Sequence, residues 1–112
     1  MLGMSATAGR ALAGTDHLRQ SIRDILTTPI GSRVELREYG SNLFNLIDRP
    51  VDEVLKVDII VATVDALRRW EPRLEVSRVE VESAAPGAIT LAITGRYLPE
   101  GRVIRLDGIT VQ

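Results

Sequence analysis

The stretch that decides the fold covers residues 67–76 and has the sequence Leu-Arg-Arg-Trp-Glu-Pro-Arg-Leu-Glu-Val. Pro72 cannot continue a helix, and it restricts the residue before it to extended conformations. The sequence therefore predicts a helix that ends before Glu71 and a strand that begins soon after it. Because residues two apart in an extended segment point to the same side, Glu71 and Arg73 should lie side by side as an acid and a base. In this arrangement they are well placed for charge-assisted hydrogen bonds. The alternative to that role is a purely internal clamp, for example between Glu71 and Arg33.

Upstream of this stretch, residues 51–70 are predicted to form the longest helix of the chain. Its apolar residues fall at helical spacing into two stripes on opposite sides. The first stripe comprises Val57, Ile60, Val61, Val64 and Leu67, and the second comprises Leu55, Ile59, Ala62, Ala66 and Trp70. A helix that is apolar on two sides needs a partner on each. We favour the protein's own sheet and its first helix as the two partners. The alternative is that another subunit covers part of one stripe.

The N-terminal part is predicted to contain one more amphipathic helix and a shorter one. Apolar residues recur with helical spacing over residues 16–27, which indicates a helix with one buried face. Residues 32–40 are expected to form a connector, and residues 42–47 a short helix. Residues 1–14 are rich in alanine and glycine, which predicts a flexible arm that either stays disordered or orders on a neighbouring subunit. We therefore expect a single domain over residues 15–112.

The C-terminal part is predicted to form three strands. The alternation of apolar and polar residues changes phase at Ser77-Arg78, which indicates a β-bulge. A turn signal at residues 84–87 separates this strand from a strictly alternating one over residues 88–96. The third strand is expected over residues 103–111. Helices first and strands last predict an α+β fold, in which N-terminal helices, including the long central one, pack on a C-terminal antiparallel three-stranded sheet.

Composition excludes several classes of protein. The chain has 112 residues, of which 45% are hydrophobic and 26% charged, as in an ordinary folded domain. The net charge is −1 and acids and bases are interspersed, so nucleic acid is not an expected partner. The absence of cysteine excludes disulfides and thiol chemistry. No segment has the length and apolarity of a membrane span, and the N-terminal residues lack the features of a signal peptide, so no membrane partner is expected.

Residues suited to catalysis are few. His17 is the only histidine, and it lies at the predicted start of a helix, where a capping or surface role is expected. The sequence contains no nucleophile elbow, phosphate loop or dinucleotide fingerprint, and we expect no cofactor and no metal. Paired carboxylates, as in glycoside hydrolysis, are the one chemistry that composition permits. However, Glu75, Glu80 and Glu82 fall at polar strand positions, and few aromatic residues are available to line a sugar cleft. We therefore do not expect the protein to be an enzyme.

Three motifs carry a resemblance to a known family. Residues 24–33 are Asp-Ile-Leu-Thr-Thr-Pro-Ile-Gly-Ser-Arg, and residues 37–41 are Arg-Glu-Tyr-Gly-Ser. The long helix then ends in Trp-Glu-Pro-Arg at residues 70–73, and strands follow. Together and in this order, the motifs resemble the phage baseplate assembly protein W family, the sheath-initiator subunits of contractile tails. That family is related to a baseplate subunit of type VI secretion. The resemblance covers nearly the whole chain, from about Gly9 onward.

The resemblance implies a structural subunit of the tail baseplate, assembled in the host cytoplasm and present in several copies in the virion. It implies binding to baseplate wedge proteins and to the tail sheath protein, with the tail tube or spike hub as further neighbours. The partner-binding site is expected at Glu71, Pro72, Arg73, Arg33 and Tyr39. Sheath assembly would begin by strand addition, for which the expected residues are Ile89, Leu91, Ile93, Val103, Ile104 and Leu106. The alternatives are a peptidoglycan hydrolase, a label that some relatives carry, and a regulatory binding module of the same fold.

Overall fold

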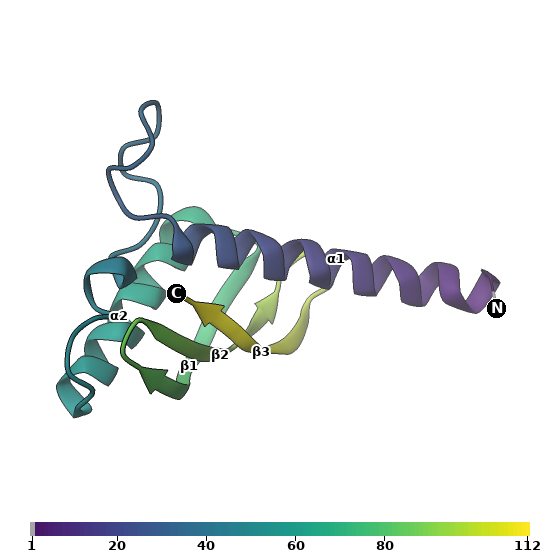
Figure 1. Ribbon diagram of the computed structural model, residues 1–112. Coiled ribbons are helices and arrows are strands. Elements are labelled where there is room, and N and C mark those ends of the chain that lie inside the picture. The colour runs from purple at the N-terminus through teal and green to yellow at the C-terminus, as the bar shows by residue number, and fades with distance from the viewer. Residues whose placement is uncertain (1) are drawn as a thin grey trace.

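The computed structural model describes the backbone of residues 2–112 and the side chains of residues 15–112. Two helices lie on one face of a three-stranded sheet, and a connector with a short 3-10 helix joins the two helices (Figure 1). In chain order the elements are α1 (Leu2–Thr27), η1 (Leu43–Asn45), α2 (Glu53–Trp70), β1 (Leu74–Ala85), β2 (Ala88–Tyr97) and β3 (Arg102–Val111). The predicted α+β fold, with helices first and an antiparallel sheet last, is confirmed.

Helix α1 is longer than predicted, because its backbone is helical from Leu2 and not only from residue 16. One face of its second half is fully buried and consists of Leu18, Ile22, Ile25 and Leu26. His17, which was expected at the start of a helix, lies inside α1 and is exposed. The prediction that residues 1–14 form a flexible arm, which either stays disordered or orders on a neighbouring subunit, concerns side chains outside the described residues and stays a prediction.

Helix α2 begins two residues later than predicted, because Asp52 caps it. The Asp52 side chain accepts a hydrogen bond from the backbone N–H of Leu55 at 2.8 Å, which satisfies one of the free donors at the helix start. The fully buried residues of α2 are Leu55, Ile59, Thr63, Ala66 and Leu67. Except for Thr63, they belong to one apolar core that α1 and the sheet share. The favoured prediction, that α1 and the sheet cover opposite sides of the helix, is wrong, since Val57 and Val61 of the first stripe are exposed.

The sheet is an antiparallel meander with β2 in the middle, between β1 and β3. The predicted bulge in β1 is confirmed, because the pairing register shifts between Val76 and Arg78. The third strand is continuous and contains a bulge of its own, which removes Asp107 and Gly108 from the regular pairing with β2. Gly108 has a φ of 66°, a left-handed conformation that glycine adopts readily in a bulge. The bulges strengthen the local twist of the strands that carry them.

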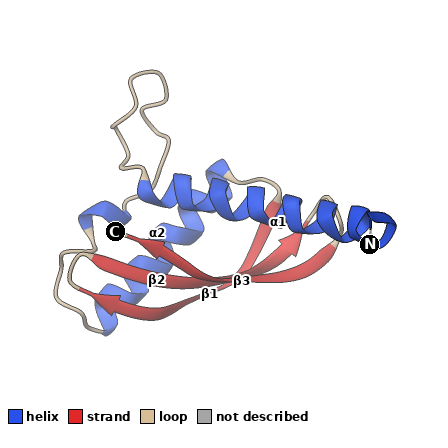
Figure 2. Ribbon diagram, turned by 45° about the vertical axis from the view of Figure 1, so that its right-hand side comes forward, coloured by secondary structure: helices blue, strands red, loops and turns tan. Residues whose placement is uncertain are grey.

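The two faces of the sheet differ in chemistry, and the helices cover the apolar one (Figure 2). The apolar face consists mainly of buried residues of β2 and β3, namely Ile89, Leu91, Ile93, Leu106 and Ile109. On the opposite face, Arg105 forms an ion pair with Asp107 at 3.0 Å. Glu82 of β1 accepts a hydrogen bond from the backbone N–H of Gly108 in β3 at 2.9 Å. That bond spans the central strand and satisfies an N–H group that the β3 bulge leaves without a partner in the ladder.

Candidate docking site at the helix-to-sheet junction

Glu71 and Arg73 form an ion pair where α2 passes into β1. Arg73 donates to both carboxylate oxygens of Glu71, from Nε at 2.9 Å and from Nη2 at 3.2 Å. The Glu71 side chain is 3% exposed, whereas the Arg73 side chain is 41% exposed. The hydrogen bonds to Glu71 raise the pKa of Arg73 further above neutral pH, at which any guanidinium is charged. The two side chains lie side by side, as the extended geometry predicts, but only the base is presented to solvent.

Arg73 is held in place and still has free donors. A guanidinium has five N–H groups, of which Glu71 takes two. The backbone carbonyl of Arg73 accepts a hydrogen bond from the N–H of Leu98 at 2.8 Å, which ties the junction to the turn after β2. Pro72 is exposed beside it. The suggested clamp between Glu71 and Arg33 is not formed. The junction therefore offers a rigid, positively charged group to a partner.

Arg33 and Trp70 lie in a second cluster, which is centred on the ring of Tyr39. The Trp70 indole N–H donates to the carbonyl of Glu38 at 3.1 Å, and the Tyr39 ring packs edge-to-face on Trp70 with centroids 5.2 Å apart. The Arg33 guanidinium lies 4.3 Å from the Tyr39 ring centroid and pairs with Asp24 at 3.1 Å. The Tyr39 hydroxyl donates to the same carboxylate. Burial, together with the hydrogen bond to Asp24 and its charge, raises the pKa of Tyr39 to about 12.

The connector that carries Tyr39 is closed at its base. The N–H of Ser41 donates to the carbonyl of Thr28 at 3.0 Å. Gly40 has a φ of 116°, and a Cβ at this position would lie only 2.1 Å from the Thr28 carbonyl oxygen, so a side chain does not fit there. Residues 31–38 are exposed, and the connector projects away from the helical layer (Figure 1). The tight base holds Tyr39 against Trp70 while the rest of the connector is open to neighbours.

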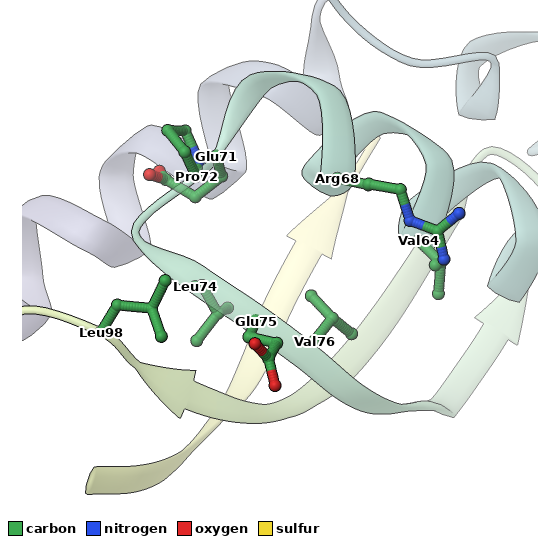
Figure 3. A pocket seen from close by; sticks show the side chains of 8 residues that line it. All are labelled: Val64, Arg68, Glu71, Pro72, Leu74, Glu75, Val76 and Leu98. Atoms are coloured by element: carbon green, nitrogen blue, oxygen red, sulfur yellow. The ribbon is translucent and has the colours of Figure 1, made fainter. Parts of the chain in front are cut away.

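A groove of about 300 Å³ opens beside the junction, between the end of α2 and the start of β1 (Figure 3). Its lining residues are Val64 and Arg68 from α2, Glu71 and Pro72 from the junction, Leu74, Glu75 and Val76 from β1, and Leu98 from the turn after β2. The walls are mainly aliphatic and contain no aromatic ring. This chemistry suits a peptide segment of another protein better than a sugar.

The central strand offers no free edge for strand addition, because β1 and β3 pair with its two sides. The three residues predicted for this role in β2 are Ile89, Leu91 and Ile93, and all are fully buried. The prediction therefore needs correction, since only β1 and β3 have an unpaired edge in the sheet. On β3, Val103 is 71% exposed and Ile104 is half-buried, whereas Leu106 is buried. Arg19 of α1 donates to the backbone carbonyl of Asp107, so the first half of β3 is its more open part.

Sequence reasoning missed three residues of this region. The Asp24 carboxylate forms an ion pair with Arg33 and accepts a hydrogen bond from Tyr39. In the sequence, only its place in the motif of residues 24–33 pointed to this residue. Arg68 and Leu98 line the groove beside the junction. No local pattern identifies them, because a helix and a turn far apart in the sequence bring them together.

The described side chains give little support for catalysis. Within residues 15–112, no group of three or more histidine or acidic side chains is arranged to hold a metal ion. Glu71 and Glu75 both line the groove, but Arg73 holds both oxygens of Glu71. A pair of free carboxylates, which glycoside hydrolysis requires, is therefore not available in this groove. Across the described residues, no helix combines the length and the apolarity that crossing a membrane requires.

Comparisons with known proteins point to tail baseplates. Residues 12–100 match the family described as baseplate wedge protein gp25. The chain is 40% identical over 105 residues to baseplate protein W of Escherichia phage P2, an alignment that covers 94% of this chain and 91% of that protein. A chain of the post-contraction pyocin R2 baseplate is 43% identical, with a TM-score of 0.62 over 73% of this chain and 83% of that one. A candidate tail lysozyme from Geobacter sulfurreducens is 26% identical, with a TM-score of 0.72 over 83% and 86% of the two chains.

Proposed function

The chain belongs to the baseplate wedge protein gp25 family, and from this membership we propose that it is a non-catalytic subunit that joins wedge proteins and starts sheath assembly. As a member of the family it is a baseplate component of a contractile tail. The single observation that carries the proposal is the 40% identity to a baseplate protein over nearly the whole chain. We expect the subunit to be made in the host cytoplasm and to enter the virion tail in several copies.

The proposed contact with the wedge proteins is the junction around Arg73. The support is physical: a buried carboxylate fixes a guanidinium that still has free donors and is 41% exposed. Such a preorganised cation can bind a carboxylate or backbone carbonyls of a partner with little loss of side-chain entropy. Arg33 and Tyr39 would extend this contact along the exposed connector. Glu71 would act by positioning Arg73 and would not touch the partner itself.

The proposed contact with the sheath is the open edge of β3. An added strand would complete the ladder with main-chain hydrogen bonds, and side chains such as Val103 would set its register. An open edge is an aggregation hazard in a free subunit, so we expect it to be covered in the assembled tail. The exposure of Val103, next to the half-buried Ile104, supports this choice of edge.

A tagged copy of the chain should test membership of the tail. It would be supplied to a tail-producing strain that lacks its own copy, and the purified tails would be quantified by mass spectrometry. We expect the purified tails to contain the chain in fixed proportion to the wedge proteins. Its absence from intact tails would overturn the proposal.

Strand addition can be tested separately with a lysine at the edge. Val103→Lys should fold normally, because the side chain is exposed, and should hinder pairing with an added strand. Electron microscopy should then show tubes on baseplates without sheath. Ser83→Lys, also at an exposed position but on the opposite edge strand, is the matched control. If Ser83→Lys blocks the sheath and Val103→Lys does not, β1 is the accepting edge.

A second candidate function, peptidoglycan hydrolysis, is favoured only by the similarity to the Geobacter protein. The structure offers no pair of free carboxylates in the groove, and Glu71 is committed to Arg73. Dye release from labelled cell walls by the purified chain decides the matter. If the chain releases dye at the rate of a lysozyme control and Glu75→Gln does not, the protein is a hydrolase and the structural proposal is wrong.

A further inference from the structure

Helix α2 carries an exposed stripe of valines on the side that faces away from the core. Val54, Val57 and Val61 are 62%, 58% and 60% exposed, and Val64 is half-buried at the end of the same stripe. Successive members are separated by three, four and three residues. This is the alternating spacing of positions a and d in a coiled coil. At 100° per residue the stripe lies opposite Leu55 and the other buried residues of α2.

The stripe has the dimensions and the surroundings of a helix-binding seam. It runs for about three turns along α2, roughly 15 Å at 1.5 Å per residue. At its C-terminal end Val64 continues into the groove beside the junction. On one flank, Val61 lines a second hollow of about 410 Å³ between α2 and the residues that flank η1, namely Asn42, Leu46 and Arg49. An exposed apolar row of this kind on a small subunit marks an interaction surface.

The charges beside the stripe select the partner. Asp58 and Asp65 lie seven residues apart on one flank, at the positions from which coiled coils form interhelical ion pairs. The Asp58 carboxylate forms an ion pair with Arg49 at 3.1 Å, and its side chain is still 42% exposed. Asp65 is exposed, and its side chain forms no hydrogen bond or ion pair with the described residues. A partner helix with basic side chains one heptad apart would match these two carboxylates.

A second copy of this chain does not supply that match. In an antiparallel pairing of two α2 helices, the flank with Asp58 and Asp65 would face the same flank of the other copy, and like charges would repel. In a parallel pairing this flank would face the side of Ile60 and Leu67, which carries no base. Charge therefore favours a different protein as the occupant.

We propose that α2 is the docking site for an amphipathic α-helix of another subunit, which places an apolar seam on Val54, Val57, Val61 and Val64 and basic residues against Asp58 and Asp65. The inference rests on the proposed function only in that it takes the partner to be a wedge component. The surface does not include Arg73, which lies past the end of the helix, but it adjoins the groove beside the junction at Val64.

A pair of synthetic helices tests the chemistry directly. The probe is a three-heptad peptide with leucine at positions a and d and lysine at the flanking positions, and its twin has glutamate in place of lysine. Titration of the full chain, followed by fluorescence anisotropy, should show at least tenfold tighter binding of the lysine peptide. Asp65→Lys should reduce or reverse this preference. Equal binding of the two peptides, or no binding of either, would overturn the proposal.

Variants of the stripe locate the binding surface. Val57→Glu with Val61→Glu should abolish binding of the lysine peptide and leave the unfolding midpoint unchanged, because both side chains are exposed. Val34→Glu, at an exposed position on the connector, should bind like wild type. If the wild-type chain dimerises in sedimentation and the double variant does not, a second copy is the occupant and the proposal is wrong.

Tails from complemented cells separate this inference from the proposed function. If the wild-type chain enters tails and the double variant enters equally well, the stripe is not a docking site but the baseplate role stands. If the wild-type chain itself is absent from tails, the proposed function fails. We expect the wild-type chain to be present in the tails and the double variant to be absent from them.

Discussion

Replacing Arg73 with alanine removes the cation from a buried carboxylate, and we expect this to cost the folded state about 2–3 kcal/mol. Breaking a buried ion pair by deleting one partner typically costs about 3–5 kcal/mol, because the remaining charge is uncompensated. Glu71 is 3% exposed, which argues for the full penalty, but Arg73 is 41% exposed, so water can reach the carboxylate once the guanidinium is gone. The loss should therefore fall at or below the lower end of the range.

Urea unfolding, followed by circular dichroism, measures this loss as a shift of the midpoint at constant slope. The matched control is Arg78→Ala, which removes an arginine that pairs with Glu80 at 3.3 Å with both partners exposed. An exposed pair contributes about 0–1 kcal/mol. The double variant Glu71→Gln, Arg73→Ala leaves no buried charge and should regain most of the lost stability. Equal midpoints for Arg73→Ala and Arg78→Ala would contradict this expectation, because they would show that the buried Glu71 carboxylate does not need Arg73.

Three further predictions concern the core and the connector. Leu91→Ala empties a fully buried position in the central strand and should lower the free energy of unfolding by about 3 kcal/mol in urea titration; a loss under 1 kcal/mol would contradict the tight core. Gly40→Ala forces a left-handed alanine against the carbonyl of Thr28 and should cost about 2–4 kcal/mol by the same assay. Tyr39→Phe removes a hydrogen bond to Asp24 and should cost about 1 kcal/mol at neutral pH. The pKa of Tyr39 is about 12 in the folded protein and 10 ordinarily, so the protonated hydroxyl stabilises the folded state fully below pH 10. This stabilisation is lost as the pH rises through 12. The difference in unfolding free energy between wild type and Tyr39→Phe should therefore shrink between pH 10 and 12.

The fold could be predicted where a single residue type decides the backbone. Pro72 fixed the end of α2 and the start of the sheet, and the change of phase at Ser77 located a bulge in β1. Both signals are local, so no knowledge of tertiary contacts was needed. The early start of α1 could not be predicted in the same way. Glycines lower helix propensity by about 1 kcal/mol each, but alanine, leucine and arginine in the same segment favour the helix that the structure shows.

The candidate site was predictable only in part, because its pairing is tertiary. The extended geometry predicted that Glu71 and Arg73 would be neighbours, but it could not show that Glu71 is buried and that Arg73 alone faces solvent. The cluster of Asp24, Arg33 and Tyr39 joins the end of α1 to the connector, and sequence separation hides it. The strand-addition residues expected in β2 do not lie at an edge of the sheet, because alternation reports burial and does not report which strand is central.

The stripes of α2 show the same limit. Their spacing predicted two apolar sides. Only the structure shows that α1 and the sheet cover most of the second stripe together with Leu67, and that Val57 and Val61 stay exposed. Periodicity tells how many faces of a helix are apolar. It does not tell which of them the protein's own elements cover.

The most direct test of the central claim is the amount of Arg73→Ala chain in tails purified from complemented cells, compared with Arg78→Ala in the same strain. Both variants should be folded in the cell extract, since a loss of about 2–3 kcal/mol leaves a domain with ordinary stability folded. Arg78→Ala should enter tails at the wild-type level, and Arg73→Ala should be absent from them. Tails that contain Arg73→Ala in normal amount would show that wedge proteins do not bind at this junction.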